Sequence, residues 1–165
     1  MANNHRLKLR RVWYVLIAVG GLMFLAVLSF PVLDGPHSRQ YANQSSAVSR
    51  LRTVTALEKN FASGHLEKGF ACELALLRPL ESEQDSTYDP LAFLTTGTSG
   101  GYKFGLGNCQ SDDKGIVVHY EATAVPMERG RTGFLAFCTD DSGLLWYDAD
   151  GSATNCLALR RAIPE

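Results

Sequence analysis

Residues 118–124 read Val-His-Tyr-Glu-Ala-Thr-Ala, so that apolar and polar side chains alternate along the stretch. Alternation with a period of two is the pattern of a half-buried β-strand. Three further β-rich runs lie nearby, and turn-forming residues separate the four. We therefore predict strands over residues 102–107, 116–125, 133–139 and 144–148. Short turns join consecutive strands as antiparallel neighbours, which predicts a four-stranded antiparallel meander.

A helical pattern precedes these strands. Apolar side chains recur at steps of three and four residues, which predicts a helix over about residues 41–63. The stripe comprises Val48, Leu51, Val54, Thr55 and Phe61. The charged side chains expected on its other faces are those of Arg50, Arg52, Glu58 and Lys59. Gly64 is a suitable left-handed end, and one face of the sheet should pack on this helix, which is an α+β solution.

Between the helix and the first strand, residues 81–100 are polar and rich in turn-forming residues. We predict that most of this stretch is a long surface loop, with a short turn at residues 91–94.

An uncharged, apolar run covers residues 12–33. At about 1.5 Å per residue, a helix of that length crosses roughly the hydrocarbon core of a bilayer. Trp13 and Tyr14 stand at its basic end, where amphipathic rings prefer the interface. The basic residues before the run are Arg6, Lys8, Arg10 and Arg11, and Asp34 follows it.

This charge asymmetry predicts a cytoplasmic N-terminus over residues 1–11 and a single transmembrane helix over residues 12–33. Residues 34–165 then form an exported domain, periplasmic or extracellular, attached to a bacterial inner membrane. A cleaved secretory signal peptide is the alternative. We favour a retained signal anchor because the run exceeds the usual apolar region of about 7–15 residues and no cleavage pattern follows it.

The residues after the run are mildly acidic. They hold 12 Lys and Arg against 17 Asp and Glu, a net charge of −5. This balance gives no electrostatic basis for binding nucleic acid, which we exclude as a partner.

All four cysteines follow the apolar run, as expected for an exported domain with disulfide bonds. Four cysteines allow three pairings, which the sequence leaves open. We favour Cys138 with Cys156 and Cys72 with Cys109. A zinc site is the other interpretation, and the wide spacing without any C-x-x-C pair disfavours it.

The order of these features resembles bacterial type IV pilins and type II secretion pseudopilins, in particular small pilin-like proteins with a Ser-Ala-Val-x-x-Leu-Arg-Thr helix. Five pieces carry the resemblance in the expected order: residues 46–53, 89–91, 99–104, 122–126 and 137–143, followed by the turn at 147–151. In that family an N-terminal transmembrane helix continues into an exported half that packs on an antiparallel sheet. The resemblance implies the same fold here and a role in assembly.

The chain departs from that family at its N-terminus. Prepilins carry a Glu at the fifth position of the apolar segment, which is thought to pair with a neighbouring subunit's N-terminal amine. Ala26 stands where that Glu would be needed after Gly21, and residues 12–33 contain no acid. The departure favours an anchor that is not processed.

Few residues suggest chemistry. The segment Gly97-Thr98-Ser99-Gly100-Gly101 resembles a nucleophile turn, but a nucleophile elbow leads from a strand into a helix, and this segment leads into a strand. His119 and Glu121 should point to the same face of their strand. We expect a cross-strand polar contact or solvent exposure for His119 and predict no catalytic residue and no enzyme.

Calcium is the candidate ion, because clustered carboxylates on turns can hold it. Its candidate ligands are Asp140, Asp141, Asp148 and Asp150. The spacing is not that of an EF-hand, and Asp-Gly and Asp-Ser-Gly are also ordinary turn sequences. We predict no other metal and no cofactor.

These patterns predict a membrane-anchored structural or assembly protein of the pilin-like kind. Its partners would be inner-membrane lipid and other pilin-like or secretion-system subunits. The alternative is a stand-alone membrane-tethered binding module of the cell envelope that forms no filament.

Overall fold

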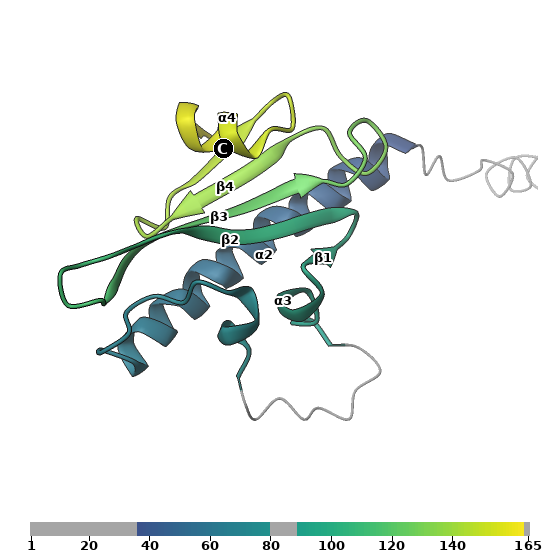
Figure 1. Cartoon of the computed structure of the whole chain (residues 1–165). Coiled ribbons are helices and arrows are strands. Elements are labelled where there is room, and N and C mark those ends of the chain that lie inside the picture. Colours follow the sequence, from purple (N-terminus) through teal and green to yellow (C-terminus); the bar gives the residue numbers. More distant parts are fainter. Residues whose placement is uncertain (1–35, 80–88, 164–165) are drawn as a thin grey trace, which may run out of the picture. The chain divides into compact units, whose positions relative to one another are not determined.

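A six-stranded antiparallel sheet forms the centre of the computed structural model, which describes residues 36–79 and 89–163 (Figure 1). The strands lie in sequence order: β1 (Thr98–Ser99), β2 (Tyr102–Ser111), β3 (Val117–Pro126), β4 (Ala136–Asp140), β5 (Leu145–Asp148) and β6 (Arg161–Ala162). The predicted four-stranded meander is therefore wrong. β2 to β5 overlap the four predicted regions, although β2 continues four residues past the predicted end and β4 begins three residues after the predicted start. β1 and β6 add a strand at each edge.

The two edge strands are too short to carry a period-two pattern, and local turn geometry creates them. Ser99 pairs with Tyr102 across a two-residue turn. Gly100 and Gly101 in that turn have φ angles of 54° and 72°, as a type I′ hairpin requires. At the other edge, Arg160 (φ 48°) reverses the chain so that β6 pairs with β5.

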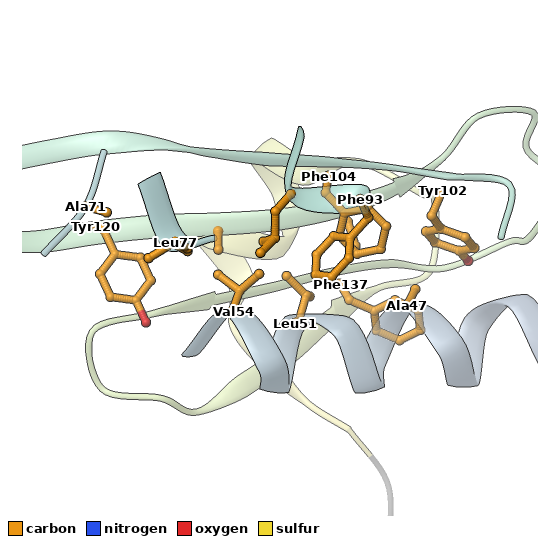
Figure 2. Close-up of a cluster of buried hydrophobic side chains, with 13 residues drawn as sticks. Ala47, Leu51, Val54, Ala71, Leu77, Phe93, Tyr102, Phe104, Tyr120 and Phe137 are labelled. Carbon is orange, nitrogen blue, oxygen red and sulfur yellow. The ribbon is translucent and has the colours of Figure 1, made fainter. Parts of the chain in front are cut away.

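The first described helix, α2 (Pro36–Gly64), has 29 residues and begins with a proline, which is favoured at the first helical position. Figure 2 shows Leu51 and Val54 pointing from α2 toward the sheet. Apolar side chains from α2 and from the sheet form the core between these two layers. They are chiefly Ala47, Leu51 and Val54 from α2, and Tyr102, Phe104, Tyr120, Ala122, Ala124 and Phe137 from the sheet.

α2 starts five residues before the predicted position. Its first turns are held to the rest of the domain by buried amide side chains, those of Gln40 and Gln44, rather than by apolar ones. A hydrophobic pattern cannot report such contacts.

A second helix, α4 (Ala153–Leu159), covers the opposite face of the sheet and contacts β3, β4 and β5. Ser152 caps it by accepting a hydrogen bond from the Asn155 N–H. The disulfide Cys138–Cys156 ties α4 to β4. Helices on both faces explain why all five residues of β4 are buried. The sequence did not predict α4.

Two short helical segments pack against each other: η1 (Leu74–Leu77), a 3₁₀ turn that also contacts α2, and α3 (Phe93–Thr96), which also contacts β1. The disulfide Cys72–Cys109 links the η1 region to β2. The prediction of disulfide bonds is thus confirmed, with the pairing that we favoured. The predicted loop over 81–100 was too long. The short turn expected at residues 91–94 corresponds to α3, which begins two residues later, β1 follows it, and Phe93 and Leu94 are buried. Residues 80–88 are outside the described ranges.

The chain divides into two units, Met1–Gly35 and Pro36–Glu165, and the helices and strands described above belong to the second. Within the described ranges, no helix is long and apolar enough to cross a membrane. The cytoplasmic segment predicted over residues 1–11 and the transmembrane helix predicted over residues 12–33 lie outside those ranges.

Candidate functional site

Two glycines of β2 leave a hollow of about 210 Å³ on the sheet face that carries α4. It is lined by Gly105, Leu106, Gly107, Asn108, Glu121, Thr123 and Leu157. A Cβ added to Gly107 would meet no atom within 4 Å, so the missing side chain itself creates open space. Ligand pockets usually enclose about 300–1,000 Å³. This hollow therefore suits one protruding side chain or a small ring rather than a large cofactor.

A bulge in β2 places polar groups at the rim of the hollow. The register with β3 shifts between Gly107 and Gln110, and Asn108 has a positive φ of 49°. Such bulges redirect a side chain. Here the Asn108 amide donates a hydrogen bond to Glu121 Oε2. The rim thus offers one oriented carboxylate beside the Thr123 hydroxyl.

His119 lies on β3 between two carboxylates. Its Nδ1 is hydrogen-bonded to Asp141 Oδ1, and its Nε2 is 4.0 Å from Glu121 Oε1. This is the polar contact expected for His119. Among the described residues, the side chains that contact the His119 ring nitrogens are these two carboxylates, and no hydroxyl or thiol is among them. The arrangement fixes the imidazole and can bind a donor or a cation at Glu121, but it includes no activated nucleophile.

The glycine segment around Ser99 has a structural explanation. Gly97, with a φ of 68°, ends α3 as its left-handed cap, and Gly100 and Gly101 form the β1–β2 turn. Ser99 stands in edge strand β1. A strand–turn–helix elbow, which a hydrolase nucleophile requires, is not formed here.

The carboxylates of Asp140 and Asp141 already have partners. Asp140 Oδ1 accepts the Ser142 N–H at 2.9 Å, and its Oδ2 lies 3.1 Å from Arg160 Nη2. Asp141 is hydrogen-bonded to His119. These groups therefore fix the β4–β5 turn and the end of α4.

Asp148 and Asp150 stabilise a second turn. Asp148 Oδ2 accepts the N–H groups of Asp150 and Ser152 at 3.0 and 2.9 Å. Asp150 Oδ1 lies 3.5 Å from Arg129 Nη2. Over residues 36–79 and 89–163, no three His, Cys, Asp or Glu side chains are grouped so that they could hold a metal ion.

Sequence reasoning placed Glu58 on a polar face of its helix, and this was wrong. Glu58 is fully buried, and its Oε2 accepts the Ala71 N–H at 2.8 Å. Burial raises the pKa of Glu58 to about 7, against the lowering effect of that hydrogen bond. The signal was present in the sequence, because Glu58 stands four residues after Val54 and seven after Leu51, on the apolar stripe.

Burial likewise raises the pKa of Tyr120 to about 12. Tyr120 and Glu58 both lie in the interior, away from any surface that a substrate could reach. We assign them to the core rather than to a site.

A larger hollow of about 630 Å³ runs beside the C-terminal half of α2. Apolar side chains dominate its walls, among them those of Leu57, Phe61, Leu76 and Leu77. It ends at Pro79, where the first described range stops.

No protein-family model matches the chain, and the searches of curated proteins and of solved structures found no significant match.

Proposed function

We propose that this chain is a membrane-anchored structural or assembly protein of the pilin-like kind. In this proposal the apolar segment of residues 12–33 attaches it to the membrane, and the domain that begins at Pro36 contacts other subunits outside the cytoplasm. The observation that carries the proposal is α2, a 29-residue helix that follows the apolar segment after only two residues and packs on the antiparallel sheet.

The outward face of α2 supports contact with another helix. Small exposed residues recur along it at steps of three and four residues, namely Ala42, Ser45, Ser49 and, after Arg52, Ala56. Interaxial distances between packed helices depend on the side chains at the contact, and small ones allow close approach. A second copy of α2, or a related helix, could therefore approach closely along this face.

The resemblance of the sequence to pilins and pseudopilins also supports a role in assembly. It implies a helix that packs on an antiparallel sheet and contributes to an assembly. Two disulfides, each expected to contribute a few kcal/mol, suit a domain that works in an oxidising compartment.

Photocrosslinking of the full chain in bacterial membranes tests the proposal. A benzophenone amino acid at Ser49 reports on the outward face of α2, and the same group at the exposed Leu159 of α4 is the control. We expect crosslinked species of higher mass from position 49 and not from position 159. Monomer alone at position 49, with the protein in the membrane, would contradict assembly.

The alternative is a membrane-tethered binding module, favoured by the glycine-floored hollow beside Glu121. Lys103 is exposed and shares a strand face with Gly105 and Gly107. A crosslinker at Lys103 that captures a different protein, while position 49 captures nothing, would support this alternative.

A further inference from the structure

The loop between β3 and β4 lies beside the first turns of α2 (Figure 1). Hydrogen bonds join the two. Gln40 Nε2 donates a hydrogen bond to Gly130 O at 2.5 Å. Asn43 Nδ2 donates another to Thr132 O at 2.9 Å.

Gln44 completes this attachment, because its Oε1 accepts the N–H groups of Phe134 and Leu135 at 3.3 and 3.1 Å. Gln40 and Gln44 are only 4% and 8% exposed. Buried amides are costly unless they are hydrogen-bonded. Hydrogen bonds made by these two buried side chains of α2, and by the partly buried Asn43, therefore fix the shape of the loop.

The loop so fixed displays apolar side chains to the outside. Met127 is 59% exposed and Phe134 is 38% exposed, and Tyr41, on the adjoining turn of α2, is 69% exposed. The loop also carries two basic side chains, Arg129 and Arg131. We call these five residues the α2 tip.

The acidic partners at the α2 tip leave the arginines accessible. Arg129 pairs with Asp150 at 3.5 Å and Arg131 with Glu128 at 2.8 Å, with 56% and 81% of the arginine side chains exposed. Exposed pairs of this kind contribute little, about 0–1 kcal/mol. Both guanidinium groups can therefore exchange a carboxylate for a phosphate oxygen at small cost.

The α2 tip adjoins the start of α2, which closely follows the apolar segment of residues 12–33 in the chain. Pro36 follows Leu33 by three residues, and three residues span at most about 11 Å. If Leu33 ends a segment held in lipid, the start of α2 lies at the membrane surface. Aromatic and Met side chains beside Arg suit that interface, since the rings bury there and the guanidinium groups reach the headgroups.

We infer that the α2 tip rests on the surface of the membrane that anchors the chain, with Met127 and Phe134 in the interface and Arg129 and Arg131 on lipid phosphates. The inference rests on the membrane attachment proposed above. It gives the domain a fixed orientation, in which the β3–β4 loop faces lipid.

The test uses the full chain in vesicles of phosphatidylethanolamine and phosphatidylglycerol with brominated acyl chains, which quench nearby tryptophan. Met127→Trp places the probe at the α2 tip in a Trp13→Phe background. Leu144→Trp is the matched control, because Leu144 is 62% exposed and its neighbour Gly143 lies beside Lys59. Lys59 is 19 residues from Gln40, about 28 Å along α2. Protein that carries only the Trp13→Phe substitution, and therefore only Trp146, gives the background emission.

We expect the Met127→Trp emission to shift to the blue and to be quenched, and the Leu144→Trp emission to stay as bright as in unbrominated vesicles. Replacing Arg129 and Arg131 with Glu should weaken the quenching at position 127. Equal quenching at both positions, or none at either in protein that floats with the vesicles, would overturn the inference and leave the anchor intact. Protein that does not float with the vesicles would overturn the attachment itself.

Discussion

At the scale of single residues, Glu58 places a carboxyl group in the core, where burial removes its charge from the solvent. Its folded pKa of about 7 lies above the ordinary 4.5. The folded state therefore binds more protons than the unfolded state between these values, and stability falls as pH rises through this window.

We predict that Glu58→Gln stabilises the domain above about pH 7 by up to about 3 kcal/mol, because it removes the buried charge and keeps an acceptor for the Ala71 N–H. Below about pH 4.5 the gain should vanish, since Glu58 is then neutral in both states. Thermal unfolding across this pH range measures the effect, and Glu67→Gln, at an exposed position, is the control. A gain that is independent of pH would contradict the assigned pKa.

Substitutions at two glycines distinguish the cost of a steric clash from the effect of reduced backbone freedom. A Cβ on Gly133 would lie 2.2 Å from the Tyr102 hydroxyl oxygen, which donates a hydrogen bond to Leu135 O. Gly133→Ala should therefore cost about 1–3 kcal/mol through overpacking. Gly107→Ala, which meets no atom within 4 Å, should change stability by less than about 1 kcal/mol. Chemical unfolding of the two variants checks this, and equal losses would show that steric contact at Tyr102 is not the cause.

The burial of some of these residues could be predicted from the sequence. The alternation along residues 118–124 places Val118, Tyr120, Ala122 and Ala124 on one face of the strand. Tyr120, Ala122 and Ala124 are fully buried, whereas Val118 is 51% exposed. The position of Glu58 on the apolar stripe could also be predicted from the sequence, but its charge led us to expect an exposed side chain. The hollow over Gly105 and Gly107 could not be predicted, because it depends on α4 covering only part of the sheet.

At the scale of elements, the β3–β4 loop depends on α2 through Gln44. We predict that Gln44→Ala leaves the Phe134 and Leu135 N–H groups without their acceptor and costs about 1–3 kcal/mol. Hydrogen exchange of these two amides should accelerate more than that of the core strands. Ser45→Ala, on the exposed face of α2, is the matched control, and unchanged exchange at both amides would contradict the attachment.

Elements with a long periodic pattern could be predicted, and those formed by local geometry could not. β3 and the apolar part of α2 follow the periods of two and about 3.6 that burial on one face imposes. The first turns of α2 escape this rule because Gln40 and Gln44 bury polar groups against a loop. α4 has seven residues and begins after an Asp-Gly-Ser turn, a length too short for a helical pattern to emerge.

At the scale of the whole molecule, two disulfides and two helical layers combine into one domain. Cys138–Cys156 fixes α4 on one face of the sheet. Cys72–Cys109 joins the η1 region to β2 on the side where α2 packs. The sequence indicated these bridges through the position of every cysteine after residue 33, whereas the number of strands required the structure.

We propose that the disulfide-bonded domain of residues 36–165 is held at a membrane outside the cytoplasm. Cell fractionation, combined with thiol alkylation of the denatured full chain before and after reduction, tests this proposal. We predict that the chain is in the membrane fraction, that protease added to spheroplasts digests the domain, and that four thiols become reactive only after reduction. A chain in the cytosolic fraction with four thiols reactive without reduction would contradict both the membrane attachment and the oxidising compartment.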